Sequence, residues 1–351
     1  MNFASDNAAG VAPDILAAIS RANDGAALAY GRDDWTRRVE QRFAELFEHE
    51  VAVFLVATGT AANALALAHL TPPWGAVLCH AEAHIATDEC GAPEFYGGGI
   101  KLIGLPGEAG KIAPETLKDA LDRGQWGGPH HVSPAVLSLS QTTEAGTIYR
   151  VDEIRALADI AHAHGMTVHV DGARFAGALA RMNASAADAT WRAGVDVLSF
   201  GATKGGALAA EAVVFFDPAR GAGMSERRKR GGHLVSKHRF IAAQFEAYLA
   251  DGRWLALARH ANAMADRLAE SLSAAGRAPV WPVEANEVFV ILPKAADARL
   301  KAAGASYYEW TTDGLPPGRA VGPDEVLVRL VTSFATIPED IERFISVARP
   351  A

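Results

Sequence analysis

Cysteine and positive charge are both scarce in this chain of 351 residues. Its two cysteines, Cys79 and Cys90, are too few for a disulfide scaffold or a four-thiolate zinc site. Its 33 Lys and Arg against 41 Asp and Glu argue against sequence-independent nucleic-acid binding, which needs clustered basic charge. Its longest apolar runs, such as 51–57, are far shorter than the roughly 18 residues that span a bilayer.

The start of the chain also lacks a basic segment followed by an apolar one, so we expect no signal peptide and a cytoplasmic location. Apolar residues, by contrast, make up 50% of the chain and charged residues 21%, enough for a large buried core. The length suits two domains, and the default expectation is a soluble enzyme.

Apolar runs bounded by glycine and proline alternate with alanine-rich stretches over the first two thirds of the chain. The expected strands are 51–56, 76–79, 100–105, 135–139, 167–170, 195–200 and 212–216, and the expected helices are 61–70, 114–122, 152–164 and 184–192. This alternation predicts right-handed crossovers and an α/β fold with a mainly parallel or mixed sheet, covered by helices on both faces.

The last third has a different pattern. A long helical region over 238–275 comes first, and the strands 288–292, 306–310 and 325–331 and a helix over 338–348 follow. We therefore predict an N-terminal arm (1–20), a large α/β domain (21–245) and a smaller α+β domain (246–351).

Asp171 follows an expected strand directly and precedes a glycine turn. The carboxyl ends of parallel strands line the ligand crevice of such sheets, so Asp171 is a candidate ligand-binding group. The alternative is an ordinary cap of the next helix.

Lys204 lies one crossover later, in a turn of Gly, Ala and Thr after the strand 195–200. A cramped, partly desolvated amine has a lowered pKa and can act as a Schiff-base nucleophile. The alternative is a phosphate-binding or merely solvated lysine, although the Walker pattern is absent.

Thr58, Gly59 and Thr60 stand at a strand-to-helix turn, where backbone N–H groups and hydroxyls can bind an anion. An ordinary threonine cap is the alternative, and no dinucleotide fingerprint occurs. Together the three segments suit a phosphate at Thr58–Thr60, a pyridinium nitrogen at Asp171 and an aldehyde carbon at Lys204. These are the binding needs of pyridoxal phosphate.

The ordered set of motifs resembles the L-threonine aldolases, which belong to the fold-type I (aspartate aminotransferase-like) pyridoxal-phosphate enzymes, in the group that includes the β-eliminating lyases. The matching pieces are Ser5-Asp6-Asn7, Tyr30-Gly31-x-Asp33-Asp34, Thr58-Gly59-Thr60-x-x-Asn63, His84, Asp171-Gly172-Ala173-Arg174, Lys204-Gly205 and Val328-Arg329-Leu330-Val331-Thr332-Ser333. The resemblance is nearest to the low-specificity and phenylserine-type enzymes, and it implies a seven-stranded, mainly parallel sheet in the large domain.

The resemblance also implies roles for single residues. His84 would lie on the face of the pyridine ring, and Lys204 would hold the cofactor as an imine. Arg174 and Arg329 would bind the substrate carboxylate with their planar forks, and Ser5 would add a hydroxyl donor. The alternatives are a His80–His84 pair on one helix face, possibly a metal site, and a surface charge at Arg329; we expect no metal.

Three further residues would act near a subunit boundary. Arg230 and Lys237 would reach the phosphate, and Tyr30 would approach a neighbouring subunit's site. The resemblance thus implies a homo-oligomer, a dimer of dimers with its sites at the subunit interface. We expect no nucleic-acid or membrane partner.

The implied reaction is retro-aldol cleavage of L-threonine, L-allo-threonine or phenylserine-type substrates to glycine and an aldehyde. The segment 140–146 departs from the family pattern, because it lacks the histidine that contacts substrate in many members. The base for the β-hydroxyl is therefore open between His84 and a bound water. Rival functions are a β-eliminating lyase or aminotransferase, an inactive cofactor-binding protein, and a small-molecule binder without this cofactor.

Overall fold

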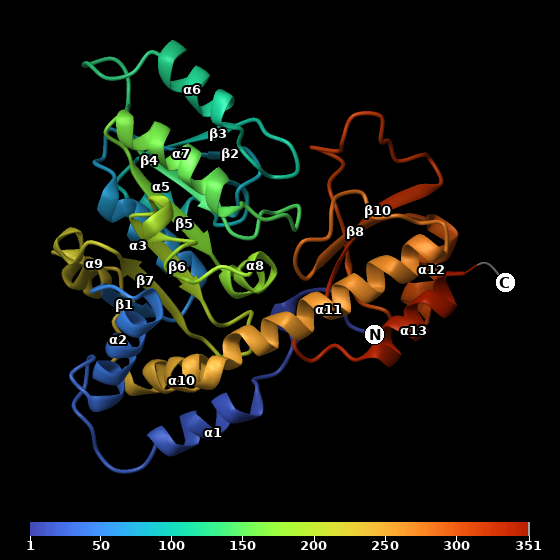
Figure 1. Ribbon diagram of the computed structural model, residues 1–351, viewed down its shortest axis with the longest axis horizontal. Coiled ribbons are helices and arrows are strands. Elements are labelled where there is room, and N and C mark those ends of the chain that lie inside the picture. Colours follow the sequence, from blue (N-terminus) through green and yellow to red (C-terminus); the bar gives the residue numbers. More distant parts are fainter. Residues whose placement is uncertain (350–351) are drawn as a thin grey trace.

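A seven-stranded sheet forms the centre of the larger part of the molecule in the computed structural model, which describes residues 1–349 (Figure 1). Its strands lie in the order β1-β7-β6-β5-β4-β2-β3. They are β1 (Ala52–Val56), β2 (Gly75–His80), β3 (Lys101–Leu105), β4 (Ser133–Ser140), β5 (Thr167–Gly172), β6 (Val197–Gly201) and β7 (Glu211–Phe215). Only β7 runs against the others, so the predicted mainly parallel sheet is confirmed.

Helices of the larger part pack around this sheet. They are α1 (Pro13–Ala22), α2 (Asp34–Phe47), α3 (Gly59–Leu70), α4 (His84–Thr87), α5 (Ala92–Tyr96), α6 (Pro114–Arg123), α7 (Val151–Ala163), α8 (Phe175–Met182), α9 (Met224–Arg230) and α10 (Arg239–Leu249). Residues 61–68 of α3 are all buried, as expected of a helix that is apolar on every side. Short 3-10 helices cover Asp6–Ala8, Trp191–Ala193, Pro218–Gly221 and Ala250–Gly252.

One helix prediction was wrong. The segment 184–190 forms turns, and the helix of this crossover is α8, nearer to β5. Asn183 ends α8 in the left-handed conformation. The predicted helical region 238–275 is confirmed, and it consists of two helices, because the helix is interrupted at Asp251, which has a φ of 53°. A left-handed residue cannot continue a right-handed helix, so α10 and α11 (Arg253–Ala274) separate there.

The smaller part is a three-stranded antiparallel sheet with the order β8-β10-β9. Its strands are β8 (Glu287–Pro293), β9 (Tyr308–Glu309) and β10 (Glu325–Val331), and its helices are α12 (Lys294–Ala302) and α13 (Pro338–Ala348). The long helix α11 leads from α10 into this part, as Figure 1 shows. Residues 350–351, the end of the predicted small domain, lie outside the described residues.

The beginning of the chain packs on the smaller sheet before it crosses to the larger part. The Phe3 amide donates to the Ser306 carbonyl, and the Val331 amide donates to the Phe3 carbonyl. The Phe3 ring is fully buried against Phe344. Residues 1–3 therefore join the core of the smaller part. Among residues 1–349 no helix combines the length and apolar character needed to cross a membrane.

Candidate active site

A cleft of about 740 Å³ opens at the carboxyl ends of the parallel strands, within the size range of small-molecule sites. It gathers residues from both parts of the chain. Nine predicted site residues line it: Ser5, Thr58, Gly59, Thr60, His84, Asp171, Arg174, Lys204 and Arg329. Residues separated by more than three hundred positions thus meet in one place.

Asp171 is the last but one residue of β5 and lies between Ser140 of β4 and Ser199 of β6. Its Oδ2 accepts a hydrogen bond of 2.8 Å from the Asn63 amide, and its Oδ1 accepts one of 3.0 Å from the Ala173 N–H. Asn63 lies one turn into α3, after the predicted anion-binding residues Thr58–Thr60. The buried Asp171 carboxylate is therefore held in one orientation at the floor of the cleft.

His84 is the first residue of α4. It is connected to Asp171 through the buried Glu89 carboxylate and the Asn63 amide. Its Nδ1 is 2.9 Å from Glu89 Oε1, which also accepts from Asn63 at 2.9 Å. The hydrogen bond to Glu89 raises the pKa of His84 above its usual value. His80 ends β2 instead of sharing a helix with His84, so the alternative of a paired helix face is wrong.

Three of these groups also have a spacing at which a metal ion could bind. Ligand atoms of His84, Glu89 and Asp171 lie within 4.8 Å of one another, a spacing that an ion could bridge. Hydrogen bonds engage His84 Nδ1, Glu89 Oε1 and Asp171 Oδ2, whereas Glu89 Oε2 is buried without a partner among the described residues.

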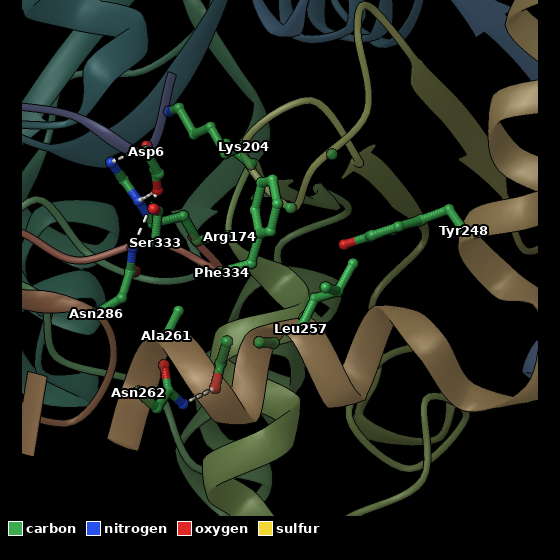
Figure 2. Close-up of a pocket in the computed structure, with 16 residues that line it drawn as sticks. Asp6, Arg174, Lys204, Tyr248, Leu257, Ala261, Asn262, Asn286, Ser333 and Phe334 are labelled. Carbon is green, nitrogen blue, oxygen red and sulfur yellow. Dashed lines mark hydrogen bonds and ion pairs between the residues drawn. The ribbon is translucent and has the colours of Figure 1, made fainter. Parts of the chain in front are cut away.

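Lys204 follows β6 and projects into the cleft from a Gly-rich turn. Its amine makes no hydrogen bond or ion pair with any side chain among residues 1–349. Glu211 lines the same cleft at the start of β7, and burial raises the pKa of its carboxyl to about 7 against the opposing charge of Lys204. Figure 2 shows the Lys204 side chain extending toward Asp6 and Arg174, beside a small cavity of about 40 Å³.

The two predicted carboxylate-binding arginines face a common buried acid. Glu287, on β8, lies 3.5 Å from Arg174 and 3.8 Å from Arg329. Arg174 is also held by Asp6, whose two carboxylate oxygens accept from its guanidinium at 2.8 and 3.2 Å (Figure 2). Although burial alone would raise it, the charges of Arg174 and Lys204 hold the pKa of Asp6 below its usual value.

Arg329 is the freer of the two arginines. Its guanidinium stacks 4.3 Å from the centre of the Trp310 ring, and its buried Nε has no hydrogen-bond partner among the described residues. Burial lowers its pKa from the usual range. Trp310 also lines the cleft, so this aromatic wall and the arginine form one side of the site.

Three predicted residues lie elsewhere on the same chain. Tyr30 is 46% exposed, and the Lys229 amine lies 4.8 Å from its ring centre. Arg230 ends α9, and Lys237 lies in the exposed loop that follows it, whose Ser236 carbonyl accepts from the Tyr30 N–H. None of the three lines the cleft, so within one chain the structure does not bring them to Lys204.

Several residues of the cleft had no predicted role from the sequence: Asn63, Glu89, Glu144, Glu211, Glu287 and Trp310. Asn63 had a local signal, because it stands one helical turn beyond Thr60 and so on the same side of α3. The buried acids had none, because a single Glu in a loop or strand reads as a surface residue.

The fold is that of the fold-type I pyridoxal-phosphate enzymes, and the cleft lies at the carboxyl ends of its parallel strands. Serine palmitoyltransferase from Sphingomonas wittichii shares this fold, with a TM-score of 0.69, 16% identity and coverage of 99% of this chain and 86% of that chain. The chain belongs to the beta-eliminating lyase family, whose model matches residues 2–295.

Threonine aldolases are more similar to this chain than the palmitoyltransferase is. A low specificity L-threonine aldolase from Pseudomonas aeruginosa is 43% identical over 313 residues, which cover 89% of this chain and 90% of that protein. One from a Pseudomonas species is 40% identical with the same coverage. A solved structure of threonine aldolase from Leishmania major superposes with a TM-score of 0.91 at 29% identity, over 99% of this chain and 98% of that chain.

Proposed function

We propose that this protein is a pyridoxal-phosphate-dependent aldolase. It cleaves L-threonine, L-allo-threonine or phenylserine-type β-hydroxy-α-amino acids to glycine and an aldehyde. The observation that carries the proposal is the cleft in which the unpaired Lys204 amine, the Asp171 carboxylate and the His84 ring meet two arginines. The similarity to threonine aldolases over about nine tenths of the chain supports it.

The residues present fit this cofactor. The Lys204 amine, which no other side chain engages, would hold the aldehyde carbon. Asp171 would pair with the ring nitrogen, His84 would lie against the ring face, and the N-terminus of α3 at Thr58–Thr60 would bind the phosphate. When bound, pyridoxal phosphate delocalises the electron pair left on Cα after bond cleavage.

The chain's own residues orient the substrate. Arg329 offers a guanidinium with an unpartnered nitrogen, which suits a bidentate contact with the substrate carboxylate. Arg174 is fixed by Asp6 and adds positive charge at the same end of the cleft. Together they would set the direction of the Cα–Cβ bond relative to the cofactor ring, while Ser5 lies close enough to the cleft to add a donor.

The proposed assembly is a homo-oligomer, with Tyr30, Arg230 and Lys237 of one subunit reaching the cleft of another. Their exposure in a single chain and their position around α9 favour this arrangement. A dimer of dimers in the cytoplasm is the corresponding proposal for the whole protein.

The test is aldehyde release from L-threonine, L-allo-threonine and the phenylserine isomers by protein saturated with pyridoxal phosphate. Activity on at least one of these substrates is expected, and none in Lys204→Ala, which should still bind the cofactor without a covalent bond. Borohydride reduction and mass spectrometry report that bond independently of turnover. Wild-type protein that binds the cofactor but releases no aldehyde from any of them would contradict the proposed activity.

A further inference from the structure

Glu144 lies in the loop after β4 and is held by one of its two carboxylate oxygens. Its Oε1 accepts hydrogen bonds of 2.9 Å from the His84 backbone N–H and 2.8 Å from the Ser140 hydroxyl. Its Oε2 is buried and has no partner among residues 1–349. The side chain lines the cleft, so one oxygen is fixed while the other is left for a ligand.

A second polar atom of the same loop is also left without a partner. Thr142 lines the cleft, and its buried hydroxyl makes no hydrogen bond with the described residues. Buried polar groups are normally paired, because leaving one unsatisfied costs about 1–3 kcal/mol. Two unpaired oxygen groups on one loop therefore point to a hydroxyl-bearing ligand that completes them.

The surroundings of Glu144 allow a proton to move on and off its carboxyl. Burial, helped by the negative charge of Asp171, raises its pKa to about 7, against the hydrogen bonds that it accepts from His84 and Ser140. The charge of Glu144 interacts with that of Arg174, and the Cys79 thiol and Tyr149 phenol, whose pKa values are raised, stay neutral. A base with a pKa near the working pH suits general acid–base catalysis.

His84, the other protein group considered for this role, is less suited. Its Nδ1 is engaged by Glu89, and the pKa of the ring is raised by that contact. This contact favours the imidazolium form, and only the neutral ring has a lone pair, on Nε2, with which to take a proton. The segment 140–146 also lacks a histidine, and Glu144 is its only ionisable residue.

We propose that Glu144 is the catalytic base for the β-hydroxyl group of the substrate, with Thr142 orienting that hydroxyl. Glu144 Oε2 takes the hydroxyl proton, and the oxygen–hydrogen electron pair becomes the second bond of the aldehyde carbonyl. The Cα–Cβ bond breaks and its electron pair stays on Cα, where pyridoxal phosphate would stabilise it when bound. Cα then takes a proton from solvent to give glycine, and Glu144 releases the proton that it took to solvent. This inference rests on the aldolase function proposed above.

The experiment compares two reactions of Glu144→Gln, which keeps the shape of the side chain and removes the base. Aldehyde release from the best β-hydroxy substrate should fall by about 10²–10⁴-fold. Exchange of the glycine α-proton in heavy water, followed by NMR, needs Lys204 and the cofactor but no β-hydroxyl group. The rate of this exchange in Glu144→Gln should stay within about threefold of the wild-type rate. Glu284→Gln, at a carboxylate that accepts from Ile148 and Arg150 outside the cleft, is the matched control.

Each outcome decides one of the two ideas. Normal aldehyde release in Glu144→Gln, or an equal loss of both reactions, overturns the role of Glu144. Wild-type protein that exchanges glycine but releases no aldehyde contradicts the aldolase function instead. If Glu144→Gln does not take up cofactor, Glu144→Ala with added formate replaces it. Restoration of aldehyde release by formate supports the base, and no restoration in a variant that still exchanges glycine contradicts it.

Discussion

At the scale of single residues, Arg329 joins the substrate end of the cleft to the smaller sheet. Its neighbour Glu287 lies on the adjacent strand, diagonally across the β8–β10 pairing, and Trp310 stacks on its guanidinium. Glu287 and Trp310 fix the plane of the guanidinium, and the unpartnered Nε remains for a ligand. The arginine is thus preorganised rather than merely nearby.

Replacing Arg329 by alanine should lower kcat/KM about ten- to a hundredfold, because a charged hydrogen-bonding partner contributes roughly 1.5–3 kcal/mol. Arg329→Lys should recover little, since an ammonium lacks the planar fork. Cofactor uptake should be normal in both variants. Arg267→Ala, at a surface ion pair with Glu342, is the control. Unchanged kcat/KM in Arg329→Ala would place this side chain outside the substrate site.

The Glu89 carboxylate should set the protonation of His84. Glu89→Gln removes the charge that favours the imidazolium, so the pKa of His84 should fall toward the usual value of about 6.5. Titration of the His84 ring protons by NMR measures this directly. The control is His260, which lies far from Glu89 in the sequence and contacts the Thr336 carbonyl. The pKa of His260 should be the same in both proteins. A His84 pKa that is the same in both proteins would show that Glu89 does not act through this hydrogen bond.

At the scale of elements, β5 contains both the site residue Asp171 and the buried titratable residue His169. His169 lies between the Ser138 and Ser199 hydroxyls, each 2.9 Å from one ring nitrogen. Burial lowers its pKa to about 4. These hydroxyls satisfy the neutral ring, whereas burial disfavours the charged one, so acid should destabilise this strand.

The sign of this effect is fixed by linkage. The unfolded chain binds a proton at His169 below about pH 6.5 and the folded chain only near pH 4, so stability falls as the pH drops through this window. The loss is on the order of 3 kcal/mol. Denaturation with urea at pH 7 and pH 4.5 should show a smaller drop for His169→Gln than for wild type, whereas exposed His131→Gln should match wild type. Equal drops in all three proteins would refute this account.

Elements with strong local patterns could be predicted from the sequence. The strands are confirmed because their apolar runs are bounded by turns, and Asp171 and Lys204 were predictable because they follow strands of a parallel sheet. The buried acids Glu144 and Glu287 were not, because their partners come from other elements far along the chain. The predicted helix 184–192 was wrong. Its alanines are typical of a helix, but they do not show that α8 is already the helix of this crossover.

At the scale of the whole molecule, the first residues tie its two parts together. Phe3 packs in the core of the smaller part, and three residues later Asp6 binds Arg174 of the larger part and Asn286 beside β8. The cleft therefore depends on both ends of the chain. A second subunit is proposed to complete it.

That proposal predicts complementation between subunits. Lys204→Ala and the double variant Arg230→Ala/Lys237→Ala should each lose activity, and mixed oligomers should regain part of it. The reason is that the Lys204→Ala subunit still has Arg230 and Lys237. It can supply them to the cleft of the other variant, which still has Lys204. A mixture of Lys204→Ala with Asp171→Asn should stay inactive, because both changes affect residues that line the cleft of their own chain. A fully active Arg230→Ala/Lys237→Ala variant, or no recovery on mixing, would contradict the shared site.

The most direct measurement of the central claim is the product balance from L-threonine with purified protein saturated with pyridoxal phosphate. The aldolase function predicts glycine and acetaldehyde in equal amounts, with none of either in Lys204→Ala. β-Elimination would instead give 2-oxobutanoate and ammonia, and transamination would give a keto acid that retains all the substrate carbons. Equal glycine and acetaldehyde would support the account; formation of a keto acid without glycine would contradict it.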